Sequence, residues 1–129
     1  MRPNTKNCFL ETPTNPNLDV LDIAEIAKIA HAAGATLIVD NVFSTPLWQS
    51  PLELGADCVV YSTTKHIAGQ GRCLGRVHLG SQQLIPDTPP GFLLPPRPSA
   101  ATLHARGLVH GPETLACRLR APTQPPRHH

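Results

Sequence analysis

TLIVDNVFSTPLWQSPLELGADCVVYSTTK, residues 36–65, contains the two runs that decide the fold. The first, Thr36–Asp40, is a continuous apolar run that ends in a charge, which is typical of a parallel strand buried on both faces. The second, Asp57–Ser62, is predicted to be another strand, and it ends in a hydroxyl residue. Between them we expect a loop with one turn of helix near Leu47–Gln49.

The residues before this stretch complete an alternating pattern. Lys6–Glu11 is predicted to be a short strand, stopped by Pro13 and Pro16, because proline removes backbone donors. Asp19 is the expected N-cap of a helix that Gly34 ends, with apolar residues spaced along one helical face. The order strand, helix, strand, connection, strand favours an α/β fold with a doubly wound, mostly parallel sheet and right-handed crossovers.

Polar residues end all three predicted strands at one edge of this sheet. Glu11, Asp40 and Ser62 are those terminal residues. Ligands of open α/β sheets bind at the carboxyl ends of the strands. We therefore expect Asn15, Asp40 and Lys65 to converge there.

A lysine just past a strand, preceded by hydroxyls, is what pyridoxal phosphate requires. The cofactor aldehyde needs an amine, its phosphate needs hydroxyl and backbone donors, and its pyridine nitrogen needs a carboxylate. Lys65, Ser62 with Thr64, and Asp40 could supply these groups. Each also has an ordinary alternative, because a lone lysine is usually solvated, and aspartate and hydroxyl side chains often bind nearby backbone. Asn15, between two prolines, equally suits a turn.

The composition changes near Pro86, so we predict one α/β domain over residues 1–85 and a Pro/Arg-rich, mostly irregular tail over 86–129. Ten of the 15 prolines and five arginines lie in that tail, which has one aromatic residue. We expect irregular structure over Pro86–Pro98. A short helix over Pro112–Ala121 is possible, because proline suits a first helical turn.

Other classes of protein are not indicated. The net charge is +2 and the basic residues are scattered, so no nucleic-acid partner is expected. No apolar run approaches the roughly 20 residues that span a bilayer, which makes a cytoplasmic protein without membrane contact the default expectation. No metal is expected, since no C-x-x-C or H-E-x-x-H pattern occurs. The cysteines are interpreted as free thiols: Cys8, Cys58, Cys73 and Cys117.

Three motifs, ETPTNPN, TLIVDNVFSTP and ELGADCVVYSTTKHIAGQGRCLG, resemble the pyridoxal-phosphate enzymes of cysteine and methionine metabolism, the trans-sulfuration enzymes. GQGRCLG is most similar to their O-succinylhomoserine sulfhydrylase branch. The resemblance covers residues 2–83 and returns faintly over 111–120. It implies part of the large cofactor-binding domain of the aspartate-aminotransferase-like, fold type I enzymes.

The resemblance assigns a role to each candidate residue. It implies that Lys65 forms the Schiff base, that Asp40 pairs with the pyridine nitrogen, and that Ser62 and Thr64 bind the phosphate. It places Asn15 near the oxygen on the cofactor ring.

The implied activity is γ-replacement on an amino-acid substrate, O-succinylhomoserine plus sulfide giving homocysteine, in a homotetramer built as a dimer of dimers. A cystathionine γ-synthase or γ-lyase activity is the alternative. Family members are much longer than this chain, and the parts not matched here supply a phosphate loop, a stacking tyrosine and an arginine for the substrate carboxylate.

Three departures from the family pattern lead to further expectations. Arg76 stands where the family has a second glycine after Leu74-Gly75, and it could obstruct the turn there. Residues 89–110 lose the family motifs, and we hypothesise a frame-shifted stretch that returns to frame near Gly111. The chain could therefore be an inactive fragment, monomeric or aggregating. A small α/β binding module unrelated to the cofactor is the remaining alternative.

Overall fold

The computed structural model describes residues 1–71, 73–81, 84 and 102–120. They fall into two compact units. The first contains Met1–Tyr61 together with the strand that begins near Val77, and the second contains Ser62–Arg76 together with the last helix. The boundary predicted after residue 85 and the irregular structure expected over Pro86–Pro98 lie outside the described residues.

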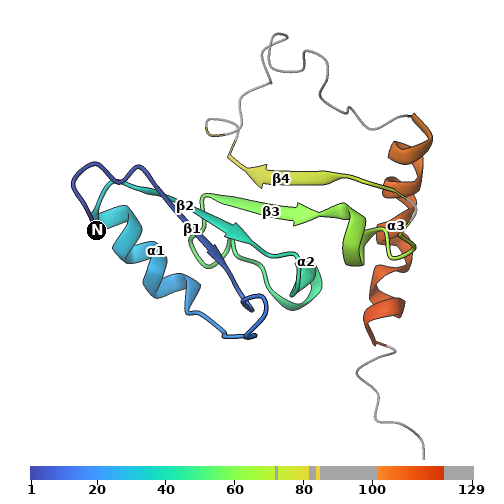
Figure 1. The fold of residues 1–129 in the computed structure, drawn as a ribbon, viewed down its shortest axis with the longest axis horizontal. Helices are drawn as coiled ribbons and strands as arrows, with labels where there is room; N and C mark the ends of the chain where they lie inside the picture. Colours follow the sequence, from blue (N-terminus) through green and yellow to red (C-terminus); the bar gives the residue numbers. More distant parts are fainter. Residues whose placement is uncertain (72, 82–83, 85–101, 121–129) are drawn as a thin grey trace, which may run out of the picture. The chain divides into compact units, whose positions relative to one another are not determined.

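A four-stranded sheet in the order β1-β2-β3-β4 organises the first unit (Figure 1). Its strands are β1 (Asn7–Glu11), β2 (Thr36–Asp40), β3 (Cys58–Ser62) and β4 (Arg76–Gly80). The first three are parallel, with β2 between β1 and β3. In Figure 1 the arrow of β4 points opposite to that of β3. The predicted α/β class and mostly parallel sheet are confirmed.

Strand β4 is an addition that the sequence analysis did not predict. Its signal was the alternation of Val77 and Leu79 with more polar neighbours. Arg76, which we expected to obstruct the turn after Gly75, is the exposed first residue of this strand. The side chain at this position is accommodated by pointing to solvent. The tight position is Gly75 itself, where an added Cβ would lie 2.5 Å from Thr63 Oγ1.

The core of the first unit lies between helix α1 (Ile23–Ala32) and the sheet. Ile23, Ala27 and Ala30 line the buried face of the helix, and β2 contributes the fully buried Leu37 and Val39. These two residues are two positions apart, so they share one face of the strand. Burial of this apolar surface is the main term that stabilises the parallel strands.

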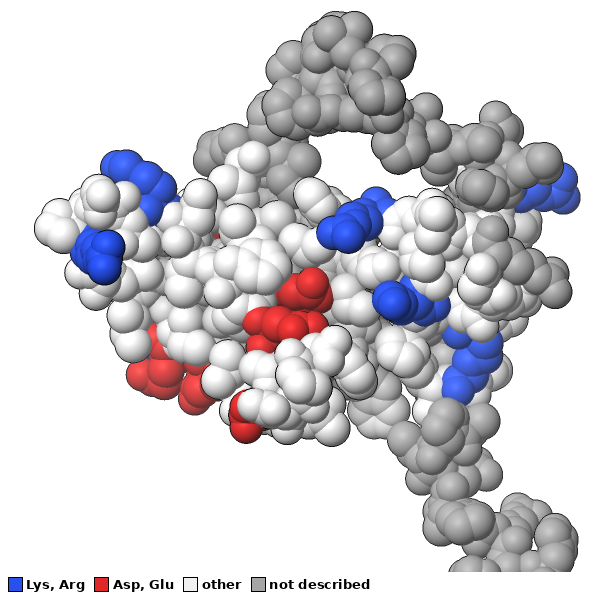
Figure 2. All heavy atoms as spheres, in the orientation of Figure 1, with Lys and Arg blue, Asp and Glu red and all other residues white. Residues whose placement is uncertain are grey.

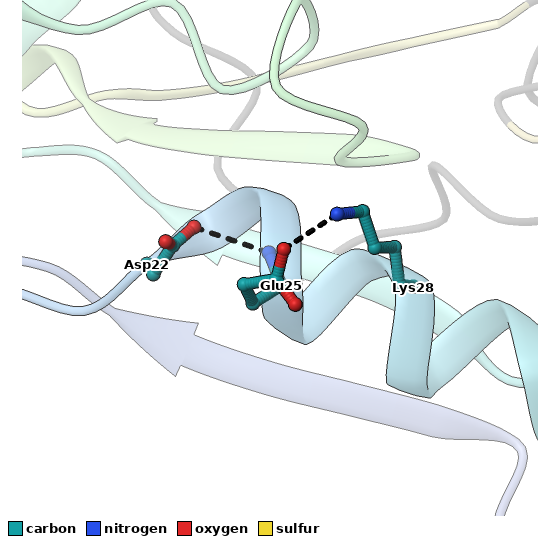
Figure 3. Close-up of polar contacts among 3 residues, drawn as sticks. All are labelled: Asp22, Glu25 and Lys28. Carbon is teal, nitrogen blue, oxygen red and sulfur yellow. Dashed lines mark hydrogen bonds and ion pairs between the residues drawn. The ribbon is translucent and has the colours of Figure 1, made fainter.

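The N-terminus of α1 is capped by Asp22, not by Asp19 as predicted. Asp22 Oδ1 accepts a hydrogen bond of 3.1 Å from the backbone N–H of Glu25, and Lys28 pairs with the Glu25 carboxylate (Figure 3). Asp19 instead binds Thr14: its backbone N–H donates to Thr14 Oγ1 over 2.9 Å. The loop before the helix therefore uses Asp19, and the helix begins three residues later.

Asp57 ties the start of β3 to β2 and α1. Its Oδ2 accepts a 2.7 Å hydrogen bond from the N–H of Leu37 and lies 2.9 Å from Nε2 of His31. Burial acts to raise the pKa of Asp57, but the Leu37 hydrogen bond and the bonding and charge of His31 outweigh it and lower the pKa. Beside it, burial and the negative Asp57 raise the pKa of the Cys58 thiol.

Two further α-helices follow α1 in the described chain. The turn predicted near Leu47–Gln49 is the short helix α2 (Thr45–Trp48). The last helix, α3 (Thr102–Arg120), begins ten residues before the predicted start at Pro112. A helix over Pro112–Arg120 is present as predicted, but its predicted start was wrong, because Pro112 was interpreted as a first-turn residue and lies inside the helix.

Candidate functional site

The three parallel strands end where the sequence predicted. β1 ends at Glu11 and β2 at Asp40, and these two residues are paired in register. On the other side of β2, Asp40 pairs with Val60, two residues before β3 ends at Ser62. The strand ends thus form one polar edge, and Asp40 occupies its middle strand.

Asp40 is half-buried and presents one carboxylate oxygen that remains available. Oδ1 accepts a 3.0 Å hydrogen bond from the backbone N–H of Val42. This contact is the strand-end cap considered as the ordinary alternative. Oδ2 accepts no hydrogen bond from the part of the chain that the structure describes. Capping and pairing with a cation are therefore compatible roles for this side chain.

Asn41, which the sequence analysis did not single out, fixes the backbone next to Asp40. Its fully buried amide donates to the carbonyl of Gln49 over 2.9 Å and to Tyr61 Oη over 3.0 Å. Gln49 Nε2 returns a 2.8 Å hydrogen bond to Asn41 Oδ1. The end of β2 is thereby connected to β3 and to the residues after α2. A buried, fully bonded amide orients its neighbours strongly because an unmade bond there is costly.

Asn15 lies on the loop that follows β1. Its backbone N–H donates to Glu11 Oε2 over 3.2 Å, and its side chain is exposed. Since Glu11 is in register with Asp40, this contact keeps Asn15 at the same strand edge. The amide of Asn15 remains free to contact a ligand there.

Lys65 lies in η1 (Thr63–Ile67), a short π-helical turn directly behind β3. Its backbone leaves the helical range with φ −84° and ψ −121°, and its side chain is exposed. Within the described residues its amine has no ion-pair or hydrogen-bond partner. A lysine amine that is not committed to a carboxylate can react with an aldehyde once it is deprotonated.

The hydroxyls around Lys65 differ in their environments. Thr64 Oγ1 accepts a 3.0 Å hydrogen bond from the N–H of Gly75 and donates to its carbonyl over 3.3 Å. Ser62 is half-buried and its hydroxyl makes no hydrogen bond to other described residues. Thr63, which the sequence analysis passed over, has a buried Oγ1 without a partner among them. The predicted backbone-binding alternative therefore applies to Thr64 and leaves Ser62 available.

The predicted site residues belong to both units. Asn15 and Asp40 lie in the first, and Ser62, Thr64 and Lys65 in the second. Their convergence stays a prediction.

A hollow of about 300 Å³ lies elsewhere in the first unit, between α2, the following loop and the sheet. Gln49, Leu52, Tyr61 and Leu79 are among its lining residues, and none of the predicted site residues is. Among the described residues no three His, Cys, Asp or Glu side chains gather as metal ligands, and no helix is long and apolar enough to cross a membrane. On the face in Figure 2, basic side chains lie in separate groups.

The chemistry of the predicted residues fits pyridoxal phosphate. They offer an uncommitted amine, an available carboxylate oxygen and a free hydroxyl on Lys65, Asp40 and Ser62. The orphaned Oγ1 of Thr63 adds a second unsatisfied hydroxyl beside the lysine. Buried polar groups normally have partners, so an orphan is consistent with a ligand contact.

The chain is similar in sequence to a family of known enzymes. The model of the Cys/Met metabolism PLP-dependent enzyme family matches residues 1–125. The chain is 47% identical over 120 residues to an O-succinylhomoserine sulfhydrylase of Pseudomonas aeruginosa, covering 93% of this chain and 30% of that protein. It is 40% identical over 127 residues to a cystathionine γ-lyase of Bacillus subtilis, covering 94% of this chain and 32% of that protein.

Solved structures agree with this similarity. The crystal structure of metB from Corynebacterium glutamicum matches with a TM-score of 0.81 and 37% identity, over 91% of this chain and 30% of that chain. The chain thus spans about a third of the length of the relatives that it matches.

Proposed function

This chain belongs to the Cys/Met metabolism PLP-dependent enzyme family, and on that premise we propose that it carries part of the cofactor site of a γ-replacement enzyme, with Lys65 as the residue that bonds pyridoxal phosphate. The observation that carries the proposal is an uncommitted lysine amine directly behind a buried strand and next to hydroxyl residues. The proposed reaction converts O-succinylhomoserine and sulfide to homocysteine and succinate. The relative of that name at 47% identity supports this choice of substrate.

In this proposal each side chain binds a different group of the cofactor. Lys65 holds the aldehyde carbon covalently. The free oxygen of Asp40 keeps the ring nitrogen protonated, as a carboxylate favours a neighbouring cation. Ser62 and Thr64 donate hydroxyl hydrogens to the phosphate, which for Thr64 means releasing the Gly75 carbonyl. Asn15 donates its side-chain amide to the ring oxygen.

Pyridoxal phosphate, when bound, supplies an electron sink for negative charge that develops on the substrate. The chain supplies proton transfer. Lys65 would be the base that takes the proton from the α carbon of the substrate and later returns one. In the net reaction the bond between the γ carbon and the succinyl oxygen breaks, a bond from that carbon to sulfur forms, and succinate departs with the electron pair.

One alternative rests on a specific observation. The similarity to a cystathionine γ-lyase at 40% identity favours a lyase or a cystathionine γ-synthase reaction by the same residues. In an active enzyme the remaining binding groups would come from chain outside these residues, and we propose a homotetramer with a small amino acid as the substrate.

Absorbance tests the proposal directly. The purified chain with excess pyridoxal phosphate should develop a visible band that borohydride removes, and Lys65→Ala should not. A wild-type chain that stays colourless with excess pyridoxal phosphate would contradict the proposal. If the band forms, a thiol assay with O-succinylhomoserine and sulfide separates an active enzyme from a fragment that only binds the cofactor, and replacing sulfide by cysteine identifies a cystathionine-forming enzyme.

A further inference from the structure

Arg118, near the end of α3, reaches the backbone that follows Lys65. Its Nη1 donates to the carbonyl of His66 over 2.6 Å, and Nη2 donates to the carbonyl of Ile67 over 2.9 Å. All of these residues belong to the second compact unit. One guanidinium therefore holds the carbonyls of the two residues that follow the lysine.

Two other carbonyls of the same turn accept hydrogen bonds from the backbone instead of from Arg118. The carbonyls of Thr63 and Lys65 accept hydrogen bonds from the N–H groups of Ala68 and Gly69, both over 2.8 Å. The end of a helical turn leaves carbonyls unpaired and carries partial negative charge, which a cation there stabilises. The planar guanidinium of Arg118 supplies two N–H donors and a positive charge to the carbonyls of His66 and Ile67.

Two glycines lie at the contact between α3 and η1. Gly69 has φ +68°, and an added Cβ there would lie 2.1 Å from Arg118 Nη1. A Cβ on Gly111, in α3, would lie 2.3 Å from the carbonyl oxygen of Ile67. At Gly111 the obstacle is backbone, so only glycine permits the approach there, whereas at Gly69 the obstacle is a flexible side chain and the positive φ is what favours glycine.

Arg118 is also fixed on its own helix. Nε donates to Thr114 Oγ1 over 3.0 Å, and Nη2 donates to the carbonyl of Gly111 over 2.9 Å. The side chain is therefore already ordered in the folded chain, and its grip on η1 needs little further ordering.

Lys65 is thus restrained from both sides. Before it, Thr64 is bound to Gly75, and after it the backbone is bound to Arg118. We propose that Arg118 is a positioning residue for Lys65, holding the lysine backbone so that the amine faces the cofactor aldehyde. This inference rests on the proposed function.

Trapping with borohydride tests the inference without any turnover. The chain has three lysines, Lys6, Lys28 and Lys65, so the first two serve as internal controls. The chain of 129 residues is mixed with pyridoxal phosphate and reduced, and the label on each lysine is measured by peptide mass spectrometry. In the wild type we expect Lys65 to carry most of the label.

Arg118→Met removes the fork and should lower the ratio of label on Lys65 to label on the other lysines by about tenfold, the equivalent of one charge-assisted hydrogen bond. Arg118→Lys keeps the charge but not the fork, so its ratio should fall between. Arg106→Met removes an exposed arginine of the same helix and should leave the ratio unchanged.

Two results overturn the inference in distinguishable ways. An unchanged ratio in both Arg118 variants shows that Lys65 needs no such restraint. Equal labelling of all three lysines in the wild type removes the proposed function, and the inference with it. If Arg118→Met loses its helical circular dichroism, the labelling ratio of Arg118→Lys is the one that tests the inference.

Amide hydrogen exchange tests the same restraint without the cofactor. Exchange at Ala68 and Gly69 should be faster in the Arg118 variants than in Arg106→Met, and equal exchange rates would contradict the restraint.

Discussion

Asn41 Nδ2 donates a 3.0 Å hydrogen bond to Tyr61 Oη, joining the residue after β2 to the penultimate residue of β3. Both side chains are buried, with exposed fractions of 0% and 4%. Asp40 precedes Asn41, and Lys65 follows Tyr61 by four residues. The bond therefore connects the two strand ends that carry the proposed cofactor groups.

We predict that Asn41→Ala lowers the free energy of unfolding by about 3 kcal/mol, because it removes the hydrogen bonds of this amide to the Gln49 carbonyl, to Tyr61 Oη and from Gln49 Nε2. Tyr61→Phe removes only the hydroxyl and should cost about 1 kcal/mol. Urea denaturation measures both, and Asn17→Ala, at an exposed position, is the matched control. Equal stability of Asn41→Ala and the control would show that the amide does not hold the strand ends together.

The strand ends could be predicted from the sequence, but the side-chain contacts that hold the residues next to them could not. β2 and the carboxyl ends of β1 and β3 follow from apolar runs and their terminal polar residues, which are local signals. Asn41 and Arg118 could not be identified because their contacts join residues distant in the chain: Asn41 bonds Tyr61, 20 residues away, and Arg118 bonds Ile67, 51 residues away. Thr63 could not be identified because only the folded chain shows that its hydroxyl is buried. The cap at Asp22 was missed because Asp19 and Asp22 have equal local propensity, and only the contact with Thr14 separates them.

The Asp22 cap gives a second prediction. Asp22→Ala should destabilise the first unit by about 1 kcal/mol, because the N–H of Glu25 loses its acceptor, and Asp22→Ser should retain most of the stability. Asp19→Ala, at the cap predicted from sequence, should cost less. Thermal denaturation followed by circular dichroism compares the three variants. A larger loss for Asp19→Ala than for Asp22→Ala would reverse the assignment.

Asp57 gives a prediction about pH. Its pKa is lowered in the folded chain, so the unfolded state binds its proton more readily, and the stabilisation is present above the unfolded pKa of about 3.9. It is lost as pH falls through the lower folded pKa. The effect should be small, because the side chain is 36% exposed and screened by solvent.

Melting temperatures between neutral pH and pH 3 check this expectation. Asp57→Asn should be less stable than wild type near neutrality, and the difference should shrink on acidification. His31→Ala removes one of the groups that lower the pKa and should retain part of the pH dependence. Glu53→Gln, at an exposed position, is the control. A constant difference between Asp57→Asn and wild type across this range would contradict the linkage.

The edge of the sheet gives the last prediction. Among the described strands β1 is the first in the sheet order and pairs with β2 alone, and its Phe9 side chain is 62% exposed. An exposed apolar edge strand is a template for pairing with another chain. The isolated chain should therefore associate irregularly, and Phe9→Lys should raise the monomer fraction, because a charge on an edge strand opposes such pairing. Size-exclusion chromatography with light scattering measures this, and Val109→Lys, at an equally exposed apolar position on α3, should change the fraction less. A homogeneous wild-type tetramer that Phe9→Lys leaves intact would show that this edge is not where the chains meet.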